Sequence, residues 1–428
     1  MDSNKIGIEG ENFVNDIAFK SFLKYWCYPN PKFENGSRKE ICDLLVIFDN
    51  TCIIFSVKNY SFKGSHSRYF NNTVEKAVKQ LKGAQKTLFT SSEVIIKHPD
   101  RTLEVFPKNS IEKIFKIVIN LGEGLEFYDI TRTTKENDFI TIFDKDTFST
   151  ITNELDTIPD FIDYLEKREK LFKFTNVKVF NSEFQGELDD QDQQYIRTGM
   201  GRSVNIIGTE KDLLSYFFKN TRNFPEKLTN NDFSIYGDAV LEIAGSWEEF
   251  KLSRQAACKE RADALSYFVD QFIKNEVLSQ NYVFKELLAK ELLSLNRLKR
   301  RTIGNRFFEF YFKIKEYNER ILHRSFLELG DLGIVFFNYF EDSDQQEIQK
   351  LFELIFETFA YYYNYRHKTF VLIGINKSPD FVYNIYKNYE RFTASDEEII
   401  KHNIKELEWF TSYSQYSRIE NEFPDTGP

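Results

Sequence analysis

The strongest constraint on the fold is a pair of apolar runs, Leu44 to Phe48 and Thr51 to Val57, separated only by Asp49 and Asn50. Short runs rich in β-branched and aromatic residues predict strands. An Asp-Asn pair tolerates the positive φ of a tight turn. We therefore expect a two-stranded antiparallel ribbon with a two-residue loop.

The length of this loop decides which side chains meet, because side chains alternate between the two faces of a strand. With two loop residues, Phe48 pairs with Thr51 and Asp43 pairs with Ser56, so Asp43, Ser56 and Lys58 share one face. A three-residue loop would place Asp43 and Lys58 on opposite faces. A buried charge without a partner is costly, so an aspartate and a lysine in a buried ribbon are candidate functional residues.

Two helices are predicted to flank the ribbon. Gly10-Glu11-Asn12 opens the first, whose apolar stripe consists of Phe13, Val14, Ile17, Ala18, Phe22 and Tyr25. The second follows the ribbon and contains Ala77-Val78-Lys79-Gln80-Leu81, beside the core stripe Val74, Ala77, Leu81, Ala84 and Leu88.

This order of elements resembles the PD-(D/E)xK nuclease superfamily, and most of all its Mrr-like and nuclease-related (NERD-like) branches, over about residues 5 to 95. The resemblance implies a restriction-endonuclease-like mixed sheet flanked by helices, in the α/β (α+β) class. It also implies catalytic roles for Glu11, Asp43 and Lys58. A Mg²⁺ or Mn²⁺ ion would be held by Glu11, Asp43 and the backbone carbonyl of Val57.

One position departs from the family pattern. The acid expected two residues before the lysine is Ser56, which is neutral and short. Glu75, on the helix after the ribbon, is the first candidate to replace it, and Glu40 is the second. Gln80 on the same helix is a further candidate for this fourth position.

The proposed chemistry follows from the residue types. Carboxylates are hard oxygen ligands for Mg²⁺, which acidifies a bound water and stabilises charge on phosphorus. Lys58 would orient or deprotonate the attacking water, or neutralise phosphate oxygens. Each residue also has a purely structural interpretation: Asp43 as a turn cap, Lys58 as a strand-end lysine reaching solvent, and Glu11, with Glu9 as its rival, as a first-turn acid.

Charge is unevenly divided along the chain. The net charge is −9, but residues 1 to 100 carry 14 Lys and Arg against 11 Asp and Glu. The basic excess follows the ribbon, where Lys63, Arg68, Lys76 and Lys79 are candidate contacts for a nucleic-acid backbone. A solvated helix face is the alternative for the lysines at 76, 79, 82 and 86.

The 428 residues allow two or three domains. We expect a nuclease-like domain over residues 1–172 and a linker or long loop over 173–210. The region 211–428 would be a mostly helical recognition, sensor or oligomerisation domain with a small α/β unit of strand 333–340, helix 344–365 and strand 369–375. The basic cluster at 297–301 is better explained as a solvated face or as partners for nearby acids than as a phosphate site.

Four cysteines without CxxC spacing favour buried thiols, and no run is long enough to span a membrane, so a cytoplasmic protein without membrane contact is expected. The resemblance implies a metal-dependent endonuclease acting on DNA in bacterial defence. It would work as a homo-oligomer or with a partner protein of a defence system. Two alternatives stay open: a catalytically weakened nuclease fold that binds nucleic acid or scaffolds a partner, and a nuclease that cleaves RNA.

Overall fold

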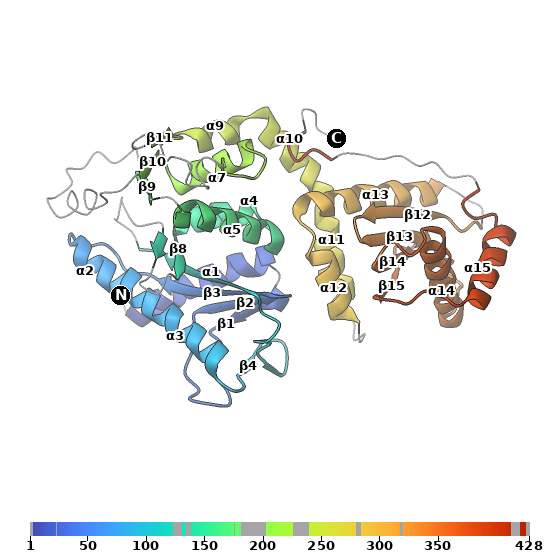
Figure 1. The fold of residues 1–428 in the computed structure, drawn as a ribbon, viewed down its shortest axis with the longest axis horizontal. Helices are drawn as coiled ribbons and strands as arrows, with labels where there is room; N and C mark the ends of the chain where they lie inside the picture. Colours follow the sequence, from blue (N-terminus) through green and yellow to red (C-terminus); the bar gives the residue numbers. More distant parts are fainter. Residues whose placement is uncertain are drawn as a thin grey trace. The chain divides into compact units, whose positions relative to one another are not determined.

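A computed structural model describes residues 3–22, 24–122, 131–133, 138–174, 176–180, 203–225, 239–279, 284–316, 320–411 and 420–424 (Figure 1). The chain forms two compact units, Met1–Ser253 and Arg254–Pro428. Both combine helices with a mixed sheet, which confirms the expected α/β (α+β) class.

The first unit is built on a six-stranded mixed sheet of order β1-β2-β3-β6-β8-β7. Its strands are β1 (Cys27–Pro29), β2 (Leu44–Phe48), β3 (Thr51–Lys58), β6 (Lys113–Asn120), β8 (Phe139–Asp144) and β7 (Thr131–Thr133). β3 pairs antiparallel with β2 and parallel with β6. The ribbon therefore lies inside the sheet, which explains why β2 is apolar throughout and β3 is apolar except for Thr51, Ser56 and Lys58.

The register of the ribbon is the predicted one. Phe48 pairs with Thr51 and Leu44 pairs with Phe55, so the loop contains only Asp49 and Asn50. Asp49 takes a φ of 51°, in the left-handed region that aspartate tolerates better than most residues. The same alternation places Asp43, at the start of β2, opposite Ser56.

Helices cover both faces of this sheet (Figure 1). α3 (Lys76–Thr90) packs Leu81 and Ala84 against the face that carries Ile54 and Val118. It is reached through α2 (His66–Phe70) and the π-helical turn η2 (Asn71–Glu75). The other face is covered by α1 (Ser3–Phe22), α4 (Lys145–Glu154) and α5 (Ile158–Phe174), where the rings of Phe55 and Phe148 meet.

A second, smaller sheet of the first unit begins in the segment that we expected to be a linker. β9 (Asn176–Phe180), β10 (Ser203–Ile207) and β11 (Ala239–Glu242) form a parallel sheet, accompanied by α7 (Glu210–Lys219) and α9 (Ser246–Leu252). The expected linker 173–210 therefore contributes two strands, and the units divide after Ser253 rather than near residue 210. The polar core of that linker, residues 181–202, lies outside the described residues.

Three short elements complete the first unit: β4 (Ile95–Lys97), β5 (Leu103–Val105) and η1 (Lys24–Trp26).

The second unit combines a helical layer with a four-stranded sheet of order β12-β13-β14-β15. Its strands are β12 (Arg324–Leu329), β13 (Leu332–Asn338), β14 (Thr369–Ile375) and β15 (Phe381–Lys387). α14 (Gln345–Tyr362) connects the parallel strands β13 and β14, as the sequence predicts. The remaining helices are α10 (Arg254–Asp263), η3 (Ala264–Ser266), α11 (Tyr267–Phe272), η4 (Ile273–Val277), α12 (Lys285–Leu293), α13 (Arg297–Glu316) and α15 (Ala394–Glu406).

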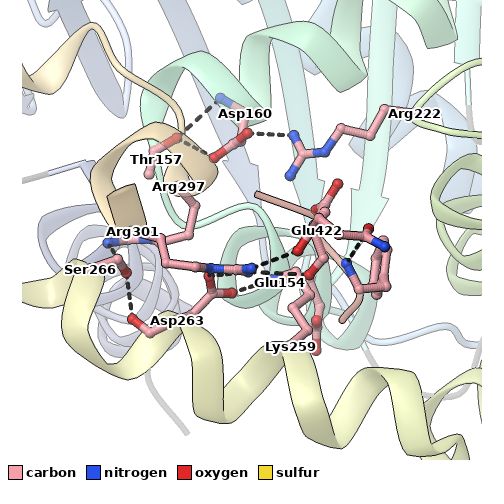
Figure 2. A network of polar contacts seen from close by, with 12 residues as sticks. Glu154, Thr157, Asp160, Arg222, Lys259, Asp263, Ser266, Arg297, Arg301 and Glu422 are labelled. Atoms are coloured by element: carbon pink, nitrogen blue, oxygen red, sulfur yellow. Dashed lines mark hydrogen bonds and ion pairs between the residues drawn. The ribbon is translucent and has the colours of Figure 1, made fainter. Parts of the chain in front are cut away.

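The three arginines of the basic cluster on α13, Arg297, Arg300 and Arg301, are buried within this unit. Arg297 and Arg300 both bind Asp270. Arg301 binds Asp263 through two nitrogens and donates to the backbone carbonyl of Glu422 (Figure 2). Of the two structural interpretations of this cluster, partners for nearby acids is confirmed, and a solvated helix face is wrong for these three arginines.

Candidate active site

The ribbon brings Lys58 and Asp43 together at its open end. The Lys58 ammonium lies 3.7 Å from the Asp43 carboxylate, and both side chains are almost fully buried. Burial lowers the pKa of Lys58, an effect that the Asp43 carboxylate opposes. Asp43 also accepts a hydrogen bond from the backbone N–H of Val57. These contacts fix the carboxylate and the amine at the end of a central strand.

Ser56 occupies the position of the expected acid and takes part in a polar chain. Lys58 Nζ donates to Ser56 Oγ at 2.9 Å, and Ser56 Oγ donates to Gln80 Oε1 of α3 at 3.2 Å. Lys58 Nζ also donates to the carbonyl of Val57 at 2.8 Å. The amine is thus oriented by a hydroxyl and a carbonyl, and the helix glutamine is brought to the site as the sequence proposed.

Glu11 reaches the same region from α1. It is close enough to act electrostatically on both Lys58 and Glu40. Its Oε2 accepts a hydrogen bond from Asn30 Nδ2 at 3.0 Å. Asn30 has a φ of 44°, donates its backbone N–H to the carbonyl of Asp43, and carries an amide oxygen that is buried without a partner among the described residues.

Asn30 was not anticipated from the sequence. Asn30 follows β1 in an irregular segment. No periodic pattern there predicts the direction in which a side chain points. Its neighbour Pro29 and its position between two apolar stretches indicate only a turn. In the structure, the Asn30 side chain nevertheless contacts Glu11, and its backbone N–H contacts the carbonyl of Asp43. Glu11 and Asp43 are both predicted metal ligands.

Glu40 is the acid that the structure brings to Asp43. Partial burial, the Asp43 carboxylate and the Glu11 carboxylate raise the pKa of Glu40 to about 7, while Lys32 opposes them. Glu75, the first candidate from the sequence, lies half-buried in η2. Glu40 was only the second choice because the path of the chain between Asn30 and Asp43 cannot be read from a pattern.

The residues present fit a small, hard cation. Among the described residues, no three Asp, Glu, His or Cys side chains are already gathered into a ligand cluster. Mg²⁺ does not need one, because it is commonly held by one or two carboxylates with waters completing its octahedron. Asp43 with Glu11 or Glu40, and the carbonyl of Val57, would supply such a set. The unpaired amide oxygen of Asn30 is of the same chemical kind.

A pocket of about 460 Å³ opens directly beside these groups. Asp43, Glu40 and Ser56 lie in its lining, and Gln80 stands on its α3 side. The acidic end of the ribbon is therefore reachable from solvent, although Asp43 and Lys58 are themselves nearly buried.

The basic residues that the sequence proposed for nucleic-acid contact are at the surface. The side chains of Lys63, Arg68, Lys76 and Lys79 are all exposed. Lys76 is near enough to Lys58 to help lower its pKa, so this basic strip begins beside the site.

Comparison with known proteins gives no family for this chain: no family model, no curated protein and no solved structure matches it. Two further expectations concern the chain as a whole. All four cysteines are buried and free, as expected. Within the described ranges, no helix combines the length and the apolar character needed to cross a membrane.

Proposed function

We propose that this protein is a metal-dependent nuclease that hydrolyses phosphodiester bonds of DNA, with its active site at the open end of the β2–β3 ribbon. The observation that supports it is the buried Lys58 amine held between the Asp43 carboxylate, the Ser56 hydroxyl and the Val57 carbonyl. Burying a lysine beside a hydroxyl, a carbonyl oxygen and a carboxylate is expensive for a structural role alone. The resemblance to the PD-(D/E)xK superfamily rests on the same residues.

Each group has a role in this proposal. Asp43, Glu11 or Glu40, and the Val57 carbonyl would hold the cation. A Mg²⁺ bound there would acidify a water and stabilise the negative charge of the phosphoryl group. Lys58, whose pKa is lowered by burial, can accept a proton from the attacking water or donate hydrogen bonds to the phosphate oxygens.

The surroundings suit a polyanion. Lys76 provides exposed positive charge next to a site that is itself acidic, and Lys63, Arg68 and Lys79 are also exposed. Such a strip would bind the phosphate backbone and make binding salt-dependent. The same chemistry would act on RNA, so both nucleic acids belong in the test.

One observation favours a second function. Ser56 cannot supply the charge of the family acid, and its hydroxyl is already engaged by Lys58 and Gln80. A protein with this site could bind nucleic acid and position a partner without cleaving.

The test is cleavage of supercoiled plasmid, single-stranded DNA and RNA by the purified chain with Mg²⁺ or Mn²⁺, and with EDTA as the metal-free control. We expect the wild type to cleave and Asp43→Asn and Lys58→Met to be inactive. Cleavage that persists in both variants would refute this assignment of the site. Metal-dependent binding without cleavage would establish the second function instead.

A further inference from the structure

The pocket beside the ribbon has two walls, and its lining includes residues of the proposed active site. One wall is the chain from Phe33 to Asp43, and the other is α3. Asp43 and Ser56 belong both to the pocket lining and to the cluster around Lys58. Any group that enters the pocket is therefore adjacent to a phosphate bound at Asp43.

The α3 wall is shaped by a glycine. Gly83 and Ala84 lie three and four residues after Gln80, and Thr87 lies four and three residues after them, so all four share one face of the helix. Gly83 lies in the helix interior, where glycine is unfavourable, and a Cβ built on it meets nothing within 4 Å. Packing therefore does not require a glycine here. Gly83 borders the pocket, and the space beside its Cα is open.

The opposite wall is firmly anchored. Asn35 bonds the carbonyl of Glu93 and the N–H of Ile95, and Glu34 N–H bonds the Ile95 carbonyl. Gly36 lies so close to the Phe33 ring that a Cβ there would come within 2.4 Å of it. The aromatic ring is thus held in a built wall rather than on a loose loop.

We infer that this pocket accepts the base of an unpaired nucleotide, next to the phosphate that the proposed active site binds. Its volume of about 460 Å³ lies in the range of pockets that enclose a small organic group. Its lining combines an aromatic ring and apolar side chains (Phe33, Ile41, Leu81, Ala84) with hydrogen-bonding groups (Ser37, Lys39, Gln80, Thr87). Pockets for nucleobases combine stacking surfaces with polar groups at the edge of the base in this way.

This inference rests on the proposed function and narrows its substrate. A base cannot enter the pocket while it is stacked and paired within a duplex. The preferred substrate would therefore be single-stranded, or a duplex from which one nucleotide is extruded.

The experiment compares two fluorescent probes that share a backbone: a pentamer of deoxyadenosine, and the same pentamer with every base removed. Binding to the full-length chain is measured by fluorescence anisotropy with Ca²⁺ as the cation, and gels confirm that the probes remain intact. We expect the wild type to prefer the base-bearing probe about tenfold, the contribution of stacking one base.

Substitutions on α3 then locate the preference. Gly83→Leu fills the pocket and should abolish the preference, whereas Gly83→Ala leaves room and should retain it. Thr90→Leu places the same new side chain at the exposed end of the same helix, outside the pocket lining, and should also retain it. Thermal unfolding confirms that all three variants are folded.

The outcomes separate the two proposals. A wild type without base preference, or a Gly83→Leu variant that keeps it, overturns the nucleobase pocket even if cleavage depends on Asp43 and Lys58. A preference that Gly83→Leu removes supports the pocket even if no variant cleaves, in which case only the nuclease proposal fails.

Discussion

Lys58 and Asp43 stand on neighbouring strands, and the Lys58 ammonium lies 3.7 Å from the Asp43 carboxylate at the end of the ribbon. The pair is too long for a direct hydrogen bond, and the ammonium instead donates to Ser56 and to the Val57 carbonyl. Because burial lowers the pKa of Lys58 despite the nearby carboxylate, the amine releases its proton more readily than a surface lysine.

Lys58→Met should abolish cleavage while leaving the fold intact. Loss of a group that moves a proton in the transition state reduces rates about 100-fold or more. The replacement keeps an apolar stem of similar length, so packing changes little. Single-turnover cleavage and thermal unfolding of the same preparation measure the two effects separately.

The matched control is Lys116 on β6, a second buried lysine of the same sheet. It bonds Asp138 at 2.6 Å and Gln85 at 2.8 Å. Lys116→Met should lower the free energy of unfolding by about 1–3 kcal/mol and leave the cleavage rate within a few-fold of the wild type. Equal loss of cleavage in both variants would mean that Lys58 is only structural.

Glu40 should make stability depend on pH in the absence of metal. Its pKa rises from an ordinary 4.5 to about 7 in the folded chain, so the folded state binds more protons than the unfolded state between these values. Stability contributed by this group is present below pH 4.5 and is lost as the pH rises through about 7.

Denaturant unfolding of wild type and Glu40→Gln in EDTA, from pH 5 to pH 8, tests this sign. Between pH 5 and pH 8, the free energy of unfolding should decline less in Glu40→Gln than in the wild type. Binding of Mg²⁺ should tighten over the same range in the wild type, since a protonated carboxyl does not bind the cation. Identical pH profiles for the two chains would remove Glu40 from the site.

Asn30→Ala should weaken Mg²⁺ binding about tenfold, because the Asn30 side chain orients Glu11. Isothermal titration calorimetry measures the affinity. Asn50→Ala is the control: Asn50 donates to Glu112 at 2.7 Å at the opposite end of the ribbon. If the two substitutions have equal effects on Mg²⁺ affinity, Asn30 has no special relation to the site.

Ser56→Asp should supply the acid that the site lacks. Ser56 is 2% exposed and its hydroxyl touches Lys58, so the new carboxylate would lie between the amine and the cation site. We expect tighter Mg²⁺ binding, and lower stability in EDTA, where the added charge faces Asp43 without a cation. Ser56→Asn introduces a side chain of similar size without the charge. If Ser56→Asp and Ser56→Asn had the same Mg²⁺ affinity and the same stability in EDTA, the prediction would be wrong.

The basic cluster on α13 should matter for folding and not for nucleic acid. Arg301 is almost fully buried and binds Asp263 together with Lys259. Arg301→Met should therefore cost about 3 kcal/mol of stability. Lys299→Met, at an exposed position of the same helix, should change neither stability nor DNA affinity. A clear loss of DNA affinity in the latter would reopen the phosphate-binding interpretation.

The ribbon and its register were predictable because strand alternation is a local rule. The two apolar runs and the Asp49-Asn50 loop were enough to place Asp43, Ser56 and Lys58 on one face. The helix glutamine was found for a similar reason: Gln80 lies in a periodic helix whose buried stripe orients it.

The contribution of Asn30 could not be predicted, and Glu40 could be named only as the second candidate for the missing acid. Both lie between β1 and β2, where the path of the chain is set by contacts distant in sequence, such as those of Asn35 with Glu93 and Ile95. No periodicity connects such a segment to the site. The unit boundary was misplaced for a related reason, since the polar stretch that suggested a linker is flanked by two strands of one sheet.

The hydrogen bond from the Val57 N–H to Asp43 has one more consequence. The Asp43 carboxylate, which would hold a cation, also accepts the hydrogen bond that protects the Val57 amide of the central strand. Cation binding and protection of this amide therefore depend on the same carboxylate. Proton–deuterium exchange at that single amide would therefore report how often this end of the strand opens. If cation binding breaks the hydrogen bond between the Val57 N–H and the Asp43 carboxylate, the exchange becomes faster. If the carboxylate binds the cation and keeps this hydrogen bond, the exchange becomes slower. The measurement requires no substrate.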